Sequence, residues 1–114
     1  MTSTREDHDD PVLRLLEPGE RLHARAEATD ASLIVTDRRV AVAINDRLAM
    51  AVPFTSLRRV QFDIERGRPA TLVLVPDRPA DPPQVLAIPP TQYAVAVEAL
   101  AVIGQRLADA ADRA

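Results

Sequence analysis

Apolar and polar residues alternate with a period of two over most of the chain between residues 21 and 88. This spacing is typical of β-strands that bury one face, because successive side chains of a strand point to opposite sides. The clearest example places Val60, Phe62 and Ile64 on one side and charged or amide residues between them. The pattern predicts seven short strands, over residues 21–28, 32–35, 40–44, 48–52, 59–65, 71–75 and 84–88.

Turn-forming residues separate the predicted strands. Asn45 and Asp46 lie between the third and fourth strands, and Gly67 lies between the fifth and sixth. These residue types favour tight turns. Residues 76–83 contain four prolines, which cannot donate to a β-ladder, and they predict a stiff loop before the last strand.

The period changes to that of a helix after the last strand. Residues 91–111 predict one amphipathic helix, with Thr91 as its N-cap. Its expected buried stripe is formed by Tyr93, Ala96, Val97, Leu100, Ile103, Leu107 and Ala111. Three further apolar residues, Val95, Ala99 and Val102, are expected on another side of the helix, free of that stripe.

The start of the chain predicts a polar tail followed by a helical turn. Residues 1–10 have charge but almost no apolar side chains, so we expect a disordered acidic tail. Residues 10–16 then have a capping aspartate, a proline suited to the first helical position and three apolar residues on one face. We expect a single domain over residues 11–114, with this turn packed on its body.

Composition limits the possible functions. The 114 residues fit one domain, there is no cysteine, and no apolar run approaches the length needed to cross a bilayer. The formal net charge of −3 comes from the tail, since the remaining residues have 13 arginines and 13 acids. A neutral body argues against nucleic-acid binding, which needs a basic surface. Cytoplasmic residence is the expectation.

Three short motifs occur in order along the body. Leu15–Glu20 contains L-x-x-G-E, Leu33–Val40 reads LIVTDRRV, and Val52–Val60 reads VPFTSLRRV. With seven strands and a final helix, these motifs resemble the bacterial pleckstrin-homology-like (GRAM-like) domain family. The resemblance implies a mainly β fold, a partly open barrel of two orthogonal antiparallel sheets capped by one C-terminal helix. Members of such families bind lipids, peptides or other proteins, so the resemblance implies no single ligand.

The motif residues also have structural interpretations. Thr36 and Asp37 have side-chain oxygens suited to a turn, and Leu57 and Val60 are expected in the core. Arg39 is expected to lie along the sheet, with its guanidinium on turn carbonyls or on a carboxylate.

The sequence predicts no catalytic site, no metal site and no cofactor. His8 lies among tail acids, and His23 lies between two arginines on the exposed face of its strand. Asp63 and Glu65 are close enough for acid–base chemistry, but nearby arginines favour a solvated ion-pair face. No glycine-rich phosphate loop is present. We therefore expect a protein that is not an enzyme.

Two surfaces are candidates for binding. The first is apolar: Val95, Ala99 and Val102 of the helix, with Ala41, Ala43, Ala49 and Ala51 on the expected outer face of two strands. It favours a protein partner or self-association. The alternative is an anionic membrane surface bound by Arg21, Arg25, Arg66 and Arg68. Against it, Glu27 and Asp30 lie where inositide-binding relatives have basic residues. A small ligand between the sheets would require a sizeable apolar cavity.

Overall fold

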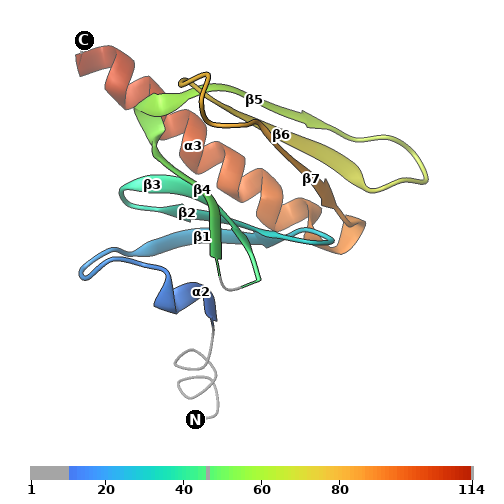
Figure 1. The fold of residues 1–114 in the computed structure, drawn as a ribbon. Helices are drawn as coiled ribbons and strands as arrows, with labels where there is room; N and C mark the ends of the chain where they lie inside the picture. Colours follow the sequence, from blue (N-terminus) through green and yellow to red (C-terminus); the bar gives the residue numbers. More distant parts are fainter. Residues whose placement is uncertain (1–10, 46, 114) are drawn as a thin grey trace.

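The computed structural model describes residues 11–45 and 47–113 and contains seven strands and two α-helices (Figure 1). The acidic tail and His8 lie outside the described residues. In chain order the elements are α2 (Pro11–Arg14), β1 (Leu22–Glu27), β2 (Ser32–Thr36), β3 (Arg39–Ile44), β4 (Arg47–Pro53), the 3₁₀ turn η1 (Phe54–Ser56), β5 (Leu57–Asp63), β6 (Ala70–Pro76), β7 (Gln84–Ile88), the 3₁₀ turn η2 (Pro90–Gln92) and α3 (Tyr93–Arg113).

The strands form two antiparallel sheets. One has the order β1-β2-β3-β4 and the other the order β5-β6-β7, so every pair of neighbours is also consecutive in the chain. The two sheets face each other, and α3 runs along the open side between them (Figure 1). The predicted seven strands and closing helix are therefore confirmed.

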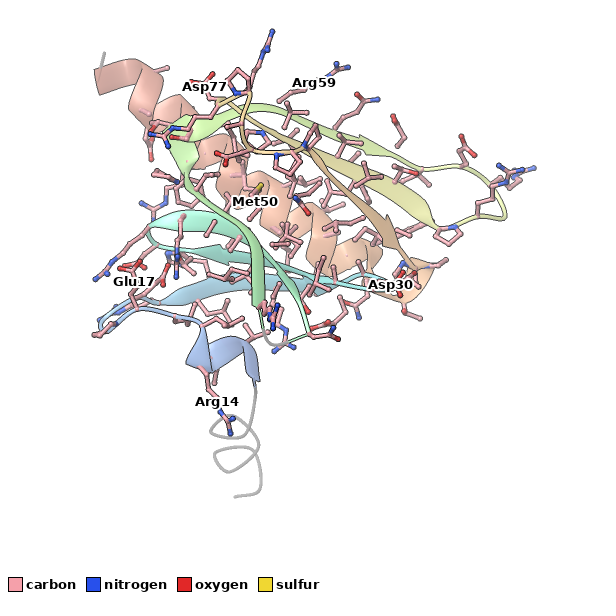
Figure 2. The ribbon with its side chains drawn as sticks, in the orientation of Figure 1. Arg14, Glu17, Asp30, Met50, Arg59 and Asp77 are labelled. Carbon is pink, nitrogen blue, oxygen red and sulfur yellow. The ribbon has the colours of Figure 1, made fainter. Side chains whose placement is uncertain are left out.

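One core fills the space between the sheets and α3. Fully buried aliphatic side chains come from β2, β3, β6, β7 and α3, and include Leu33, Leu72, Leu74, Ile88 and Ile103. Met50 points into this space, whereas Arg59 points away from it into solvent (Figure 2). Aromatic residues make up only 3% of the chain, and this core is built mostly from aliphatic side chains.

A second, smaller core lies on the other face of the first sheet. There Val12 of α2 packs with Ile34, Ala41 and Ala43 of β2 and β3. The prediction that Ala41 and Ala43 are surface residues is wrong: they are 2% and 3% exposed. The predicted helical turn explains the error, because this turn covers the face that the alternation pattern left open (Figure 1).

A β-bulge changes the pattern of β4. Val42 pairs with Met50 but Ala43 pairs with Leu48, so Ala49 is an extra residue in the ladder. Leu48 consequently packs in the smaller core under α2, whereas Met50 belongs to the main core. Ala49 and, beyond the bulge, Ala51 are exposed, as the sequence predicted.

The buried face of α3 is rotated from the predicted stripe. Ala96, Ala99 and Ile103 form its centre, at 0%, 0% and 2% exposure, while Val97 is 53% exposed. The expectation that Ala99 is free is therefore wrong. Val95 and Val102 are half-buried and pack against the core, so they too are not a spare face. Small alanines at the centre allow the backbones of α3 and the sheet to approach closely, a role that their low hydrophobicity concealed.

The start of α3 is attached to β1 through η2. The side-chain oxygen of Gln92 accepts a hydrogen bond of 2.9 Å from the backbone N–H of Glu27. Thr91, the predicted N-cap, lies inside η2, and no side chain caps that turn. The helix therefore begins two residues later than predicted.

Shortening Val12 tests the role of α2. Val12→Ala is expected to lower the free energy of unfolding by about 1–2 kcal/mol, because two buried methyl groups are lost from the contact with Ala41 and Ala43. Urea denaturation measures the change. Leu13→Ala, a truncation at a less buried neighbouring position, is the control; an equal loss in both variants would contradict the packing role of Val12.

Candidate functional site

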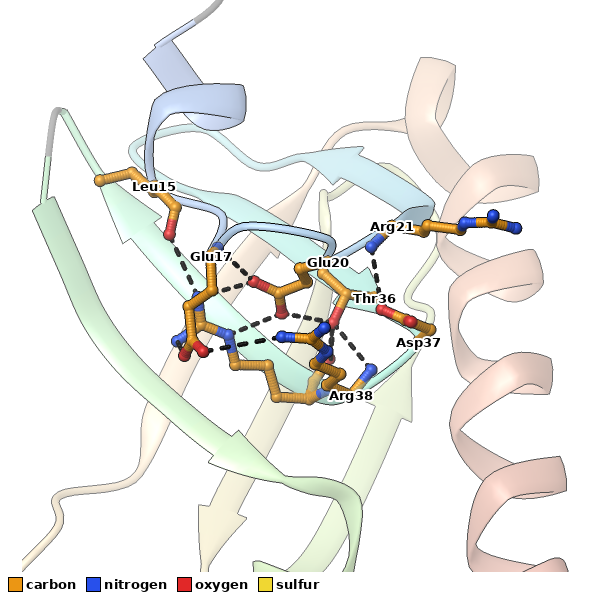
Figure 3. Close-up of polar contacts among 8 residues, drawn as sticks. Leu15, Glu17, Glu20, Arg21, Thr36, Asp37 and Arg38 are labelled. Carbon is orange, nitrogen blue, oxygen red and sulfur yellow. Dashed lines mark hydrogen bonds and ion pairs between the residues drawn. The ribbon is translucent and has the colours of Figure 1, made fainter.

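The motif residues meet in one polar network beside the β2–β3 turn (Figure 3). Its centre is the carboxylate of Glu20, whose side chain is 0% exposed. Arg39 donates to both oxygens of this carboxylate, from Nε at 2.8 Å and from Nη2 at 2.9 Å. The Thr36 hydroxyl donates at 2.7 Å, and the backbone N–H of Glu17 donates at 2.9 Å. A two-pronged guanidinium–carboxylate pair of this kind is among the strongest polar contacts in proteins.

The hydrogen bonds of this network keep both Glu20 and Arg39 ionised. The hydrogen bonds from Arg39 lower the pKa of Glu20 from 4.5 to about 2; burial opposes this shift, and the bonds from Thr36 and Glu17 add to it. The same carboxylate raises the pKa of Arg39. Both groups are therefore ionised over the whole physiological pH range.

The network joins three segments of the chain. Arg39 Nη2 also donates to the carbonyl of Leu15 at 3.1 Å, and Thr36 Oγ1 accepts from the backbone N–H of Arg39 at 3.0 Å. Asp37 Oδ1 accepts from the backbone N–H of Arg21 at 2.9 Å. Arg39 thus lies on a carboxylate and a turn carbonyl, as predicted. The three groups at the centre of the network are satisfied within the chain, which indicates a structural role.

No internal polar site for a ligand is evident in residues 11–45 and 47–113. Every buried side-chain nitrogen and oxygen there has a hydrogen-bond partner. The same residues contain no group of three or more side chains arranged to hold a metal ion. None of their helices has the length and apolar character needed to span a bilayer.

The four arginines proposed for lipid contact do not form one surface. Arg21 precedes β1, whereas Arg66 and Arg68 lie in the β5–β6 loop, at the opposite end of the molecule (Figure 1). Arg25 forms an ion pair with Glu27, and Arg68 forms an exposed one with Glu65 at 3.8 Å.

The β1–β2 loop is held against β7 and has two acidic residues, Glu27 and Asp30. Thr29 donates from its backbone N–H to the carbonyl of Ala87 on β7 at 2.9 Å. Glu27 accepts hydrogen bonds from Arg25 and from Ser32, so its carboxylate holds Arg25 at the base of this loop. Asp30 lies exposed at its tip, as Figure 2 shows. Negative charge here opposes binding of a phosphate group.

The remaining chemically interesting residues lie on the surface. His23 is exposed, and its Nε2 lies 3.2 Å from Nη2 of Arg106 on α3. Asp63 accepts a hydrogen bond from Gln61, which in turn accepts one from Arg59. This exposed row along β5, together with the Glu65–Arg68 pair, agrees with the predicted solvated polar face.

An apolar groove lies between β5 and α3. Its volume is about 320 Å³, and its lining residues are Leu57, Arg58, Arg59, Val60, Phe62, Leu100, Ile103, Gly104 and Leu107. We call it the α3–β5 groove. The ring of Phe62, one of its lining residues, meets that of Tyr93 edge to face, with centroids 6.2 Å apart.

Gly104 lines this groove without a side chain. It lies on the same side of α3 as Leu100 and Leu107, at helical spacing, and a Cβ added to it would meet no atom within 4 Å. A glycine inside a helix costs about 1 kcal/mol relative to alanine. Neither a positive φ nor a close approach of another segment requires glycine here. Packing within this chain therefore does not explain Gly104.

The α3–β5 groove was not predicted from the sequence. Gly104 could have indicated it, because this glycine lies between Leu100 and Leu107 on one side of a continuous helix. The strand that lies beside that row depends on how the sheets fold together, which the local pattern does not contain.

The chain matches no family model, and no curated protein resembles it significantly. Its structure is similar to the crystal structure of the pleckstrin homology domain from Shewanella amazonensis SB2B. The TM-score is 0.53 at 13% sequence identity, over 76% of this chain and 85% of that chain. At this identity the likeness concerns the fold alone. The chain thus has the pleckstrin-homology-like fold that its motifs indicated.

Proposed function

We propose that the protein is a non-catalytic module that binds another protein. The observation that carries this proposal is the α3–β5 groove, an open apolar surface beside a strand at the edge of its sheet. Exposed apolar surface next to an unpaired strand edge is a common feature of peptide- and protein-binding domains.

The contacts of the polar residues also favour a protein partner over an anionic ligand. Glu20, Thr36 and Arg39 are occupied with one another, and the arginines at the two ends of the molecule form no common anion site. The proposed partner is therefore a protein. The apolar surface that the sequence suggested for it is not the one that the structure leaves exposed. Ala41, Ala43 and Ala99 are buried, which leaves the α3–β5 groove as the better candidate.

The test combines self-association with identified partners. The purified chain is examined by sedimentation over a wide concentration range, and proteins captured from its source cells are purified and bound again in isolation. We expect at least one direct protein contact in the micromolar range or tighter. A strict monomer for which no captured protein binds in purified form would contradict the proposal.

Anionic vesicles provide the competing outcome. Co-sedimentation with vesicles rich in phosphatidylserine, at low salt, is expected to retain little protein. The start of β1, next to Arg21, and the β5–β6 loop, with Arg66 and Arg68, lie at opposite ends of the molecule, and Arg25 is paired with Glu27. Strong retention that is lost in Arg66→Glu/Arg68→Glu would favour the membrane alternative instead.

A further inference from the structure

We propose that the outer face of the second sheet binds a second copy of this chain, so that two such sheets stack face to face about a twofold axis. This face consists of the outward residues of β5, β6 and β7, which are Arg59, Gln61, Asp63, Thr71, Val73, Val75, Val85 and Ala87. We call it the outer β5–β7 face. The inference adds a second contact surface to the proposed function and does not depend on the α3–β5 groove.

The first argument is the apolar patch at the centre of this face. Leu72 and Leu74 of β6 are fully buried in the main core, so the residues between and beyond them point to the other side of the sheet. Val73 and Val75 lie there, and Val85 of β7 is 66% exposed. None of these three valines belongs to either apolar core of the described residues. Grouped apolar side chains without a partner are typical of interaction surfaces.

The second argument is the register of the strands, which arranges the face in rows across the sheet. The middle row is Gln61, Val73 and Val85, because Val73 is the pairing partner of both other residues. The flanking rows are Asp63 with Thr71 and Ala87 on one side, and Arg59 with Val75 on the other. A twofold axis along the middle row would stack each strand on its own copy, running in the opposite direction. Val73 and Val85 would then each face the same residue of the second copy.

The third argument is charge along β5. Arg59 and Asp63 lie on opposite sides of Gln61, so reversing the strand places Arg59 of each copy against Asp63 of the other. Within one copy the two charges are four residues apart, about 13 Å along a strand, which is too far for an ion pair. Gln61 holds both: it accepts from Arg59 at 2.8 Å and donates to Asp63 at 2.7 Å. Arg59 points into solvent, ready for an outside partner (Figure 2).

The fourth argument is charge at the two ends of the sheet. The β5–β6 loop, residues 64–69, has Arg66 and Arg68 against Glu65, a net charge of +1. The β6–β7 loop at the other end, residues 77–83, has two aspartates against Arg78, a net charge of −1. The same axis brings the first loop of one copy toward the second loop of the other, so the loop charges also attract. This alternation fits a second copy better than a uniformly charged partner.

Stacked sheets have room for these pairs. Such sheets lie about 10 Å apart and cross at about 30°. Arg59 and Asp63 lie about 7 Å from the axis, so the crossing angle displaces them by about 4 Å relative to each other, which a flexible arginine side chain spans. The face is smaller than a standard interface of about 800 Å² per partner, and we therefore expect a weak dimer with a Kd of about 10–100 µM.

Sedimentation equilibrium of the full chain, from about 1 µM to about 1 mM at low salt, measures this association. Val85→Glu is expected to weaken the dimer at least about tenfold, because two like charges would meet at the axis. Its melting temperature should not fall, since Val85 is 66% exposed. Val97→Glu is the matched control: it introduces the same charge at an exposed valine of α3, and it should dimerise like the wild type.

A charge exchange tests the twofold arrangement itself. Arg59→Glu and Asp63→Arg are each expected to weaken the dimer severalfold, because each opposes two like charges across the interface. The double variant Arg59→Glu/Asp63→Arg exchanges the two charges and is expected to restore wild-type association. Arg14→Glu, which reverses an exposed charge on α2, controls for net charge and should change nothing. Concentration-dependent amide shifts should be confined to β5, β6, β7 and their connecting loops.

The results separate this inference from the proposed function. A dimer that is lost in Val85→Glu and restored in the double variant supports it. A monomer over the whole concentration range, a dimer unaffected by Val85→Glu, or a double variant no tighter than the single ones would overturn it. The helix α3 lies on the opposite face of the second sheet (Figure 1). If a purified partner protein binds a monomeric chain, the protein-binding function therefore stands and only the second copy is excluded.

Discussion

Glu20→Gln is expected to lower the free energy of unfolding by about 3 kcal/mol at neutral pH. The variant keeps an oxygen for Thr36 but removes the charge that Arg39 contacts through two hydrogen bonds. Loss of one member leaves a largely buried guanidinium, 16% exposed, without its counter-charge. Urea denaturation of the two proteins at pH 7 measures the difference.

The same pair makes stability depend on pH in a defined direction. The Glu20 pKa is about 2 in the folded chain and near its ordinary 4.5 when unfolded. Between these values the unfolded chain binds more protons, so stability falls as the pH is lowered from about 5 to about 2. The difference between wild type and Glu20→Gln should shrink over this window and stay constant above it.

Glu17→Gln is the control for this prediction. Glu17 is also near Arg39, at 3.6 Å, but its side chain is 60% exposed, and an exposed pair contributes at most about 1 kcal/mol. Equal effects of Glu17→Gln and Glu20→Gln, or a Glu20→Gln difference unchanged between pH 7 and pH 2, would mean that the network does not stabilise the fold.

Ala99→Glu is expected to remove most of the stability of the domain, whereas Val97→Glu on the same helix should change it by less than about 0.5 kcal/mol. Ala99 is 0% exposed at the centre of the α3 contact, so a carboxylate there would be buried without a partner. Val97 is 53% exposed. Thermal melts followed by circular dichroism, with the soluble yield of each variant, compare the two.

This comparison also decides between two roles for Ala99. If it were an interface residue, Ala99→Glu would fold normally and change only the oligomeric state seen by sedimentation. The milder Ala99→Ser keeps the test quantitative should Ala99→Glu not fold, and is expected to cost about 1 kcal/mol. If Ala99→Glu were as stable as the wild type, this would contradict the burial of Ala99 in the α3 contact.

The sequence predicted the elements well because most of them obey one local rule. The strong alternation around Val60 and Phe62 and the helical spacing after Thr91 gave seven strands and a helix in the observed order. The short motifs predicted Arg39 on turn carbonyls or on a carboxylate, and in the structure it contacts both, the carboxylate of Glu20 and the carbonyl of Leu15.

The wrong predictions arise from contacts between elements, which the residue pattern within one strand or helix does not show. Ala41 and Ala43 are buried by α2, a segment about thirty residues earlier in the chain. Leu48 packs in the smaller core because Ala49 is an extra residue in β4. This bulge depends on how β4 pairs with β3. Ala99 is buried because close helix–sheet packing requires a small side chain, whereas hydrophobicity alone ranked Val97 above it.

The contact between α2 and the first sheet has a consequence for where the folding unit begins. A fragment that starts at β1 would lack both Glu20 and the Leu15 carbonyl, so Arg39 would lose its partners. It would also expose Ala41 and Ala43, together with Ile34, as one apolar patch, which favours aggregation. Any shortened or fused form of this domain therefore needs the chain from Pro11 onward, although the first strand starts only at Leu22.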